Sequence, residues 1–210
     1  MKRLIMVVVV IVLLIGLVLG CGLHGEGAGR DYRQDMRDFV EGIGAYAKGL
    51  KVGFIVIPQN GQELVSENGE ATGVPAIDYL NAIDGLGRED LFYGYDNDNV
   101  ATTVSERDYI IAFLDIAKSK GVEVLVTDYC STDTNVNDSY AQNNSKGYIS
   151  FAANHRDLDN IPAYPTPLYN VNTSNITSLS TAKNFLYLLD TSIYATKAAF
   201  LNDVQSTNYD

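Results

Sequence analysis

The segment TTVSERDYIIAFLDIAKSKGVEVLVTDY, residues 102–129, joins a helical pattern to a short apolar run. Threonine and serine residues at its start are typical helix N-caps, and Gly121 is a typical residue at a helix end. The run VEVLVTDY that follows is rich in β-branched residues, which predicts a buried strand. A helix that leads directly into a buried strand is the repeating unit of a parallel sheet.

The same alternation continues on both sides of this segment. The patterns predict helices at 31–48, 74–83, 135–147 and from 195 onward, and strands at 51–58, within 84–95, at 148–153 and at 182–190. Between residues 155 and 180 the chain is rich in Pro, Asn, Ser and Thr, which indicates a long surface connection. We therefore expect an α/β fold with about five parallel strands, an incomplete (β/α)8 TIM barrel over residues 31–210.

Polar side chains close or follow successive predicted strands. Because the carboxyl ends of parallel strands meet at one edge, the side chains there line a shared ligand site. Capping of the following loop is the structural alternative for Asp128. The residues that we expect to act on or bind a ligand are Gln59, Asn60, Glu89, Asp90, Tyr93, Asp128 and Tyr129.

The acidic pair Glu89 and Asp90 is the candidate for catalysis. A carboxyl group at the rim can serve as general acid or base on a sugar when a second carboxylate faces it across the cleaved bond. A salt bridge with Arg88 or a helix cap is the structural alternative for the pair. Gln59 and Asn60 cannot serve as acid or base, but amides bind hydroxyl groups or fix a neighbouring carboxylate.

The first 21 residues, MKRLIMVVVVIVLLIGLVLGC, have the pattern of a targeting segment. Two basic residues precede an apolar run from Leu4 to Leu19, which is a little shorter than the roughly 20 residues of a spanning helix. The run ends in VLGC, which resembles a bacterial lipobox with Cys21 as the acylated residue, and an uncleaved anchor helix is the alternative. Both predict export and attachment to the membrane, followed by a flexible tether at residues 22–30.

Composition excludes several classes of function. A formal net charge of −11 argues against nucleic-acid binding, which needs a positive surface. No His/Cys cluster has zinc spacing, and neither a phosphate loop nor a dinucleotide fingerprint occurs, so we expect no metal and no organic cofactor. The abundance of tyrosine, asparagine, serine and threonine favours neutral polar ligands. If Cys21 carries lipid, Cys130 has no partner for a disulfide within the chain and is expected to be a small, half-buried space-filling residue.

Several segments resemble a known family. They are DMRDFVEGIGAYAK, FIVIPQNGQEL, AIDGLGREDLFYGYDNDN, VLVTDYC, GYISFAANHRDLDNIP and AKNFLYLLD. From about Tyr32 to the end, the chain resembles the glycoside hydrolase family 114-like proteins, a TIM-barrel family that includes endo-α-1,4-polygalactosaminidases. The resemblance implies that these segments correspond to strands five to eight followed by strand one, in a permuted order.

The resemblance also implies a cleavage pair of one glutamate and one aspartate. Glu89 matches the glutamate, with Asp90 as the alternative, while the strand that carries the aspartate has no counterpart in this sequence. We therefore expect an exported glycoside-hydrolase-like protein for α-1,4-linked galactosamine polysaccharide, the front part of a longer barrel, with little hydrolysis of its own. The missing half of the barrel is then an expected partner. A non-catalytic surface module that binds carbohydrate is the alternative.

Overall fold

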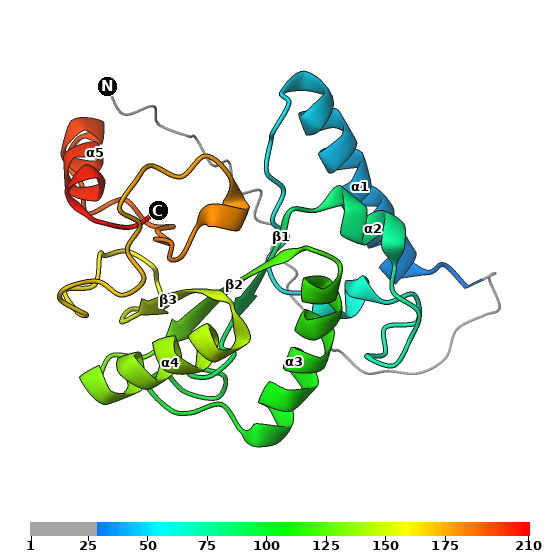
Figure 1. Ribbon diagram of the computed structural model, residues 1–210, viewed down its shortest axis with the longest axis horizontal. Coiled ribbons are helices and arrows are strands. Elements are labelled where there is room, and N and C mark those ends of the chain that lie inside the picture. Colours follow the sequence, from blue (N-terminus) through cyan, green and yellow to red (C-terminus); the bar gives the residue numbers. More distant parts are fainter. Residues whose placement is uncertain (1–28) are drawn as a thin grey trace.

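The computed structural model describes residues 29–210, which form a parallel three-stranded sheet with helices around it (Figure 1). The strands lie in the spatial order β1-β2-β3, with β1 at Gly85–Glu89, β2 at Glu123–Tyr129 and β3 at Ile149–Ala153. The α-helices are α1 (Tyr32–Leu50), α2 (Ile77–Ala82), α3 (Val104–Ser119), α4 (Asp133–Lys146) and α5 (Lys197–Ser206). Two short 3-10 helices are η1 (Gln62–Val65) and η2 (Leu179–Thr181).

Local sequence signals explain where the helices begin and end. The Asp31 side chain caps α1 and accepts hydrogen bonds from the backbone N–H groups of Arg33 and Gln34 at 3.0 and 3.1 Å. Thr103 caps α3, as the sequence predicts. Gly147 ends α4 with a φ of 67°, a backbone conformation that favours glycine. The predicted helices are confirmed, with ends shifted by a few residues.

Two further segments run beside the sheet without forming full strands. Residues 54–59 lie parallel to β1 and form one bridge, between Gln59 and Gly87. Pro58 accepts a hydrogen bond from the Gly87 N–H at 2.8 Å but has no N–H of its own, which limits this ladder. On the other edge, Asn184 forms a single parallel bridge with Ser150 of β3. The strands predicted at 51–58 and 182–190 are therefore reduced to bridges.

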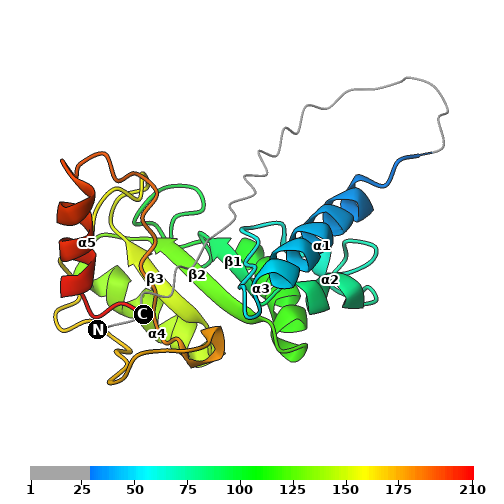
Figure 2. The ribbon, with the colours of Figure 1, turned by 90° about the horizontal axis from the view of Figure 1, so that it is seen from above.

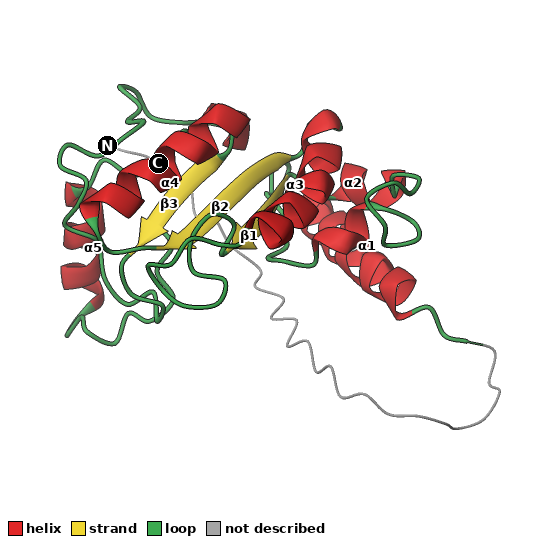
Figure 3. Cartoon of the chain, turned by 90° about the horizontal axis from the view of Figure 1, so that it is seen from below, coloured by secondary structure: helices red, strands yellow, loops and turns green. Residues whose placement is uncertain are grey.

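The two faces of the sheet are covered differently. Figures 2 and 3 show α3 and α4 alongside the sheet, and α1 and α5 at its opposite ends. Buried side chains of the sheet, α2, α3 and α4 form the main core, among them Leu86, Phe113, Leu114, Val124, Val126 and Tyr140. A smaller cluster of Ile57, Leu125 and Ile149 lies under Leu179 and Phe185 on the second face. Cys130 is buried, where the sequence predicts a half-buried space-filling residue.

The expectation of a partial (β/α)8 TIM barrel is wrong. The sheet of the described residues has three strands, and a chain segment that includes Leu179 and Phe185 lies directly on its second face. Glycine makes this close approach possible, because a Cβ atom at Gly85 would lie 3.1 Å from the Leu179 side chain and 3.0 Å from that of Leu125. The second face therefore packs against a loop and a 3-10 helix.

The predicted signal or anchor segment at residues 1–21, with Cys21, lies outside the described residues, as does most of the predicted tether. Within residues 29–210, none of the helices combines the length and the apolar character that crossing a membrane requires.

Two glycines of α1 offer a matched test of its packing. A Cβ atom at Gly44 would lie 3.0 Å from the Ala82 carbonyl oxygen at the end of α2, whereas one at Gly42 meets no atom within 4 Å. We expect Gly42→Ala to raise the free energy of unfolding by about 0.5–1 kcal/mol, because alanine is the better helix former. We expect Gly44→Ala to give a free energy at least about 1 kcal/mol below that of Gly42→Ala, because the helices cannot separate without cost. Urea denaturation in dilute solution measures both, and equal values would contradict the close α1–α2 approach.

Candidate functional site

The carboxyl ends of β1 and β2 bring three of the predicted residues together. The Tyr129 hydroxyl donates a hydrogen bond to Glu89 Oε1 at 2.5 Å, and Asn60 Nδ2 donates to Glu89 Oε2 at 3.0 Å. Each carboxylate oxygen of Glu89 thus has its own donor. The Glu89 side chain is half-buried at the last residue of β1. It is held in one orientation from two sides.

Asn60 reaches Glu89 because of an unusual backbone conformation. Its φ is 61° and that of Gly61 is 66°, so the chain turns sharply after residues 54–59. The turn lets the Asn60 Oδ1 atom accept from the Glu89 backbone N–H at 3.1 Å while its Nδ2 atom binds the Glu89 carboxylate. Asparagine adopts this left-handed conformation more readily than other residues with a side chain. We call the hydrogen bonds from Asn60 and Tyr129 to the Glu89 carboxylate the clamp on Glu89. The part played by Asn60 explains why a buried apolar run ends in Pro-Gln-Asn-Gly.

Gln59 and Arg88 place further donors near the clamp. The Gln59 amide lies over Gly87, where a Cβ atom would come within 2.0 Å of its oxygen. Arg88 donates to Gln62 Oε1 at 3.1 Å, and burial lowers the pKa of its guanidinium. The Nε2 atom of Gln59 and the Nε atom of Arg88 are buried, and residues 29–210 offer neither of them an acceptor. Buried donors without a partner are rare in folded proteins.

Arg156, three residues beyond the end of β3, covers the ring of Tyr129. Its guanidinium carbon lies 4.0 Å from the ring centroid, a cation–π contact. It donates to Asp90 Oδ1 at 3.0 Å, to Asp98 Oδ1 at 2.7 Å and to the Gly94 carbonyl at 2.7 Å. Burial raises the pKa of Asp90, and the hydrogen bond from Arg156 opposes this shift. Asp90 is therefore engaged by a cation, whereas Glu89 is held by neutral donors.

Tyr187 is a second residue near Glu89 that the sequence patterns do not identify. It comes from the segment beside β3 and packs with Tyr129 and Phe151. Burial raises the pKa of Tyr187 to about 12, with a smaller contribution from the charge of Glu89. Glu89 thus has aromatic neighbours from two different parts of the chain.

Asp128 and Tyr93 do not lie at this site. The Asp128 side chain is fully buried on the helical face of the sheet, where its oxygens accept hydrogen bonds from Ser139 Oγ at 2.6 Å and Asn143 Nδ2 at 3.0 Å. It also accepts from the backbone N–H groups of Phe92 and Tyr93. The Tyr93 hydroxyl donates to Asp138 on α4 at 2.7 Å. The bonds of Asp128 to the loop after β1 are those expected of its loop-capping alternative.

The reason for this separation is the alternation of side chains along a strand. Asp128 and Tyr129 are neighbours in β2, so they point to opposite faces of the sheet. The predicted residues that remain together are Gln59, Asn60, Glu89, Asp90 and Tyr129. Position beyond a strand end could have identified Arg156, because it follows the predicted strand at 148–153.

The chemistry available at the site is that of one carboxylate among hydroxyl, amide and aromatic groups. Glu89 can accept hydrogen bonds from a hydroxyl or an ammonium group, while Gln59 and Asn60 carry amides beside it. Aromatic rings with a hydrogen-bonding edge provide flat contact surfaces for polar ligands. No group of three or more His, Cys, Asp or Glu side chains is arranged for metal binding within residues 29–210.

Comparison with known proteins gives little further assignment. No family model matches the chain. The chain is 31% identical over 146 residues to an uncharacterized protein of Methanocaldococcus jannaschii. The match covers 65% of this chain and 40% of that protein, so it spans less than half of the relative.

Replacing Asp128 tests its structural role. In Asp128→Asn the new NH₂ group faces the Ser139 and Asn143 donors or the two backbone N–H groups, so at least one buried donor loses its acceptor. We expect the free energy of unfolding to fall by about 1–3 kcal/mol, measured by urea denaturation at neutral pH. Asp115→Asn is the control, because the Asp115 carboxylate is 56% exposed. Equal effects of the two substitutions would contradict the assigned role.

The difference in free energy of unfolding between wild type and Asp128→Asn should also change with pH in a defined direction. Burial raises the pKa of Asp128 above its ordinary value of 3.8, against hydrogen bonds that lower it. The folded chain then binds this proton more tightly than the unfolded chain does. The contribution of the Asp128 carboxyl group to the free energy of unfolding is therefore fully present below pH 3.8. It is lost as the pH rises through the folded-state pKa of this group. We expect the stability difference between wild type and Asp128→Asn to be larger at acidic than at neutral pH, and the opposite trend would show a lowered pKa.

Proposed function

We propose that this protein binds an amino-sugar polysaccharide of the α-1,4-linked galactosamine type, with Glu89 as the central carboxylate of a glycoside-hydrolase-like site. The observation that carries the proposal is the clamp on Glu89, whose two oxygens accept from Tyr129 and Asn60 at 2.5 and 3.0 Å. A carboxylate fixed in this way keeps its remaining lone pairs for a ligand. Sugar hydroxyls and ammonium groups are donors of the matching kind.

Charge and composition support an amino sugar over an anionic ligand. The chain has a formal net charge of −11, and the cation nearest to the Tyr129 ring, Arg156, is bound by Asp90 and Asp98. Anionic ligands would face unpaired acidic groups, whereas an ammonium group would meet Glu89. The resemblance of the segments around Asn60 and Glu89 to family 114-like glycoside hydrolases agrees with this substrate class.

Binding without cleavage is the activity that the site supports best. Hydrolysis of a glycosidic bond needs two carboxyl groups on opposite sides of the bond, one of which is Glu89 in this proposal. Asp90 is engaged by Arg156, and Asp128 is buried on the other face of the sheet. Neither is placed to act opposite Glu89. We therefore expect this chain alone to bind the polymer and to release few or no reducing ends.

The place of action belongs to the same proposal. The apolar run from Leu4 to Leu19 and the VLGC sequence that follows favour export and attachment to a membrane through Cys21 or through a helix. An exported protein of this kind would meet its polysaccharide at the cell surface.

Calorimetric titration of the full chain with an α-1,4-linked oligogalactosamine tests binding. We expect Glu89→Gln and Tyr129→Phe to weaken binding by about tenfold or more, because each removes a charge-assisted hydrogen bond at the carboxylate. Glu70→Gln is the control, since Glu70 is exposed outside the site. Equal affinity of Glu89→Gln and wild type would overturn the assignment of the site. A reducing-end assay on the same proteins separates the two activities: release that is lost in Glu89→Gln would show cleavage by this chain.

A further inference from the structure

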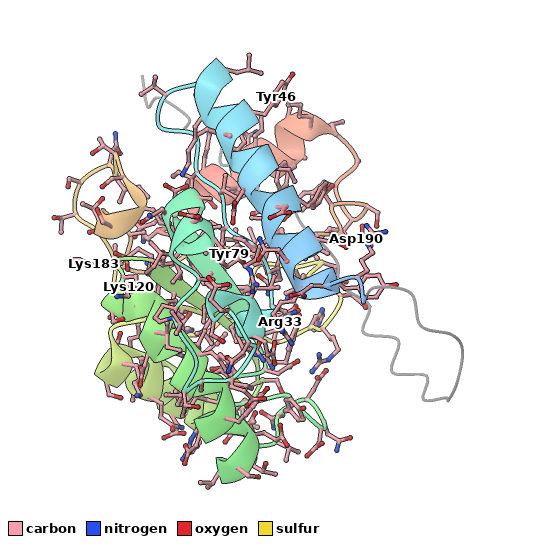
Figure 4. The ribbon with its side chains drawn as sticks, turned by 90° about the vertical axis from the view of Figure 1, so that its right-hand side faces the viewer. Arg33, Tyr46, Tyr79, Lys120, Lys183 and Asp190 are labelled. Carbon is pink, nitrogen blue, oxygen red and sulfur yellow. The ribbon has the colours of Figure 1, made fainter. Side chains whose placement is uncertain are left out.

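Helix α1 carries large apolar side chains on a face that nothing covers in residues 29–210. The exposed fractions are 75% for Tyr32, 54% for Phe39, 73% for Tyr46 and 73% for Leu50. Figure 4 looks onto α1 and shows Tyr46 on its outer side. Exposed apolar residues are ordinary when they are scattered singly, but four on one helix need an explanation.

The spacing of these residues is that of a coiled-coil seam. Together with the half-buried Met36 and Ile43 they occupy positions 32, 36, 39, 43, 46 and 50, which are separated by four, three, four, three and four residues. This alternation places six apolar side chains along one stripe of the helix. We call these six residues the α1 seam.

The seam lies beside the face by which α1 packs on its own chain and meets that face at Met36. The buried residues of α1 are Arg37, Val40 and Gly44, which lie on a different side of the helix. Arg37 donates to the Ser66 carbonyl at 3.0 Å, and Gly44 approaches α2. Of the six seam residues, Met36 packs against the main core, while Tyr32, Phe39, Tyr46 and Leu50 remain largely exposed and available for a partner.

We propose that the α1 seam pairs with the α1 seam of a second copy of this chain, in antiparallel orientation. The six positions are symmetric about the middle of the helix. In a two-fold pair, Tyr32 therefore meets Leu50 of the partner subunit, Phe39 meets Ile43 of the partner subunit, and Met36 meets Tyr46 of the partner subunit. Each layer joins an aromatic ring to a flexible aliphatic or thioether side chain. A surface that matches itself is what a two-fold dimer requires.

The helix dipoles favour the antiparallel orientation, because the N-terminus of each helix then lies beside the C-terminus of the other. The charged side chains do not decide the orientation: the start of α1 carries both signs, with Arg30 paired to Asp35, and Lys48 at its end is bound to Asp84 of its own chain. Parallel pairing would place like dipole ends together.

The area is sufficient for a specific contact. Aromatic side chains offer about 150–250 Å² each, and the seam has three that are mostly exposed, together with Leu50 and parts of Met36 and Ile43. The pair would bury roughly 1,000 Å² in total, which is at the lower limit for specific interfaces. We therefore expect a dimer of moderate affinity.

A lipid surface fits the seam less well. Helices that lie on membranes flank their apolar face with Lys and Arg. On α1 the neighbouring positions carry both signs, among them Arg33, Asp35, Asp38 and Glu41, so the seam lacks such a basic flank.

Cross-linking at the two-fold axis tests the proposal. Gly42 flanks the seam near the middle of α1, so Gly42 of one copy faces Gly42 of the partner subunit, and a Cβ atom there meets no atom of its own chain within 4 Å. In the full chain with Cys21→Ser, kept in mild detergent, we expect Gly42→Cys to form a covalent dimer on mild oxidation. Ala45→Cys, exposed on another side of the same helix, is the matched control and should remain monomeric. Cys130 is buried and does not interfere.

A second substitution separates specific pairing from random collision. Adding Phe39→Glu to Gly42→Cys should abolish cross-linking, whereas adding Ala45→Glu should leave it unchanged; circular dichroism checks that both fold. Sedimentation of the uncross-linked chain should show a concentration-dependent dimer that Phe39→Glu shifts to monomer. Equal cross-linking of Gly42→Cys and Ala45→Cys with a monomeric chain would overturn the proposal. So would protection of Gly42→Cys from maleimide by anionic phospholipid vesicles without dimer formation, which would assign the seam to a membrane.

Discussion

The buried carboxylate of Asp128 is the constraint on which the arrangement of the site depends. It accepts hydrogen bonds from the backbone of the loop after β1 and from two side chains of α4, so it ties these two parts of the chain to β2. Its neighbour Tyr129 must then point to the opposite face. That face is where the Tyr129 hydroxyl meets Glu89 at 2.5 Å. The position of Tyr129 at the candidate site thus follows from that of Asp128, which lies on the other face of the sheet.

Helices and strands with long, regular patterns could be predicted from the sequence, but the closure of the sheet could not. The helix of residues 104–119 and the strand of residues 123–129 follow directly from their apolar spacing and their caps. Whether a parallel sheet continues into a barrel depends on what covers its second face, which is a long-range contact that periodicity does not encode. Here Gly85 admits Leu179, and a loop takes the place that further strands would occupy.

The candidate site could be predicted in part for the same kind of reason. Asn60, Glu89 and Tyr129, predicted from their places at strand ends, lie together, because parallel strands deliver their last residues to one edge. Because side chains alternate along β2, Asp128 and Tyr129 could not both lie at the site. The sequence does not show which of the two faces the helical core. Tyr187 joins the site across a large sequence separation. Only its packing against Tyr129 reveals it.

The proposed dimer uses helix α1, whereas the proposed saccharide site uses Asn60 at the far end of the segment that follows α1. Lys48, near the end of α1, is fixed to Asp84 at 3.0 Å, and Asp84 in turn accepts from the Val56 N–H at 2.8 Å. These bonds join α1 and residues 54–59 to the start of β1, at the edge of the sheet opposite to Glu89. Asn60 and Glu89 lie at the other ends of the same segments. Pairing through the α1 seam would therefore stiffen the base of the clamp and leave its ligand-binding end open.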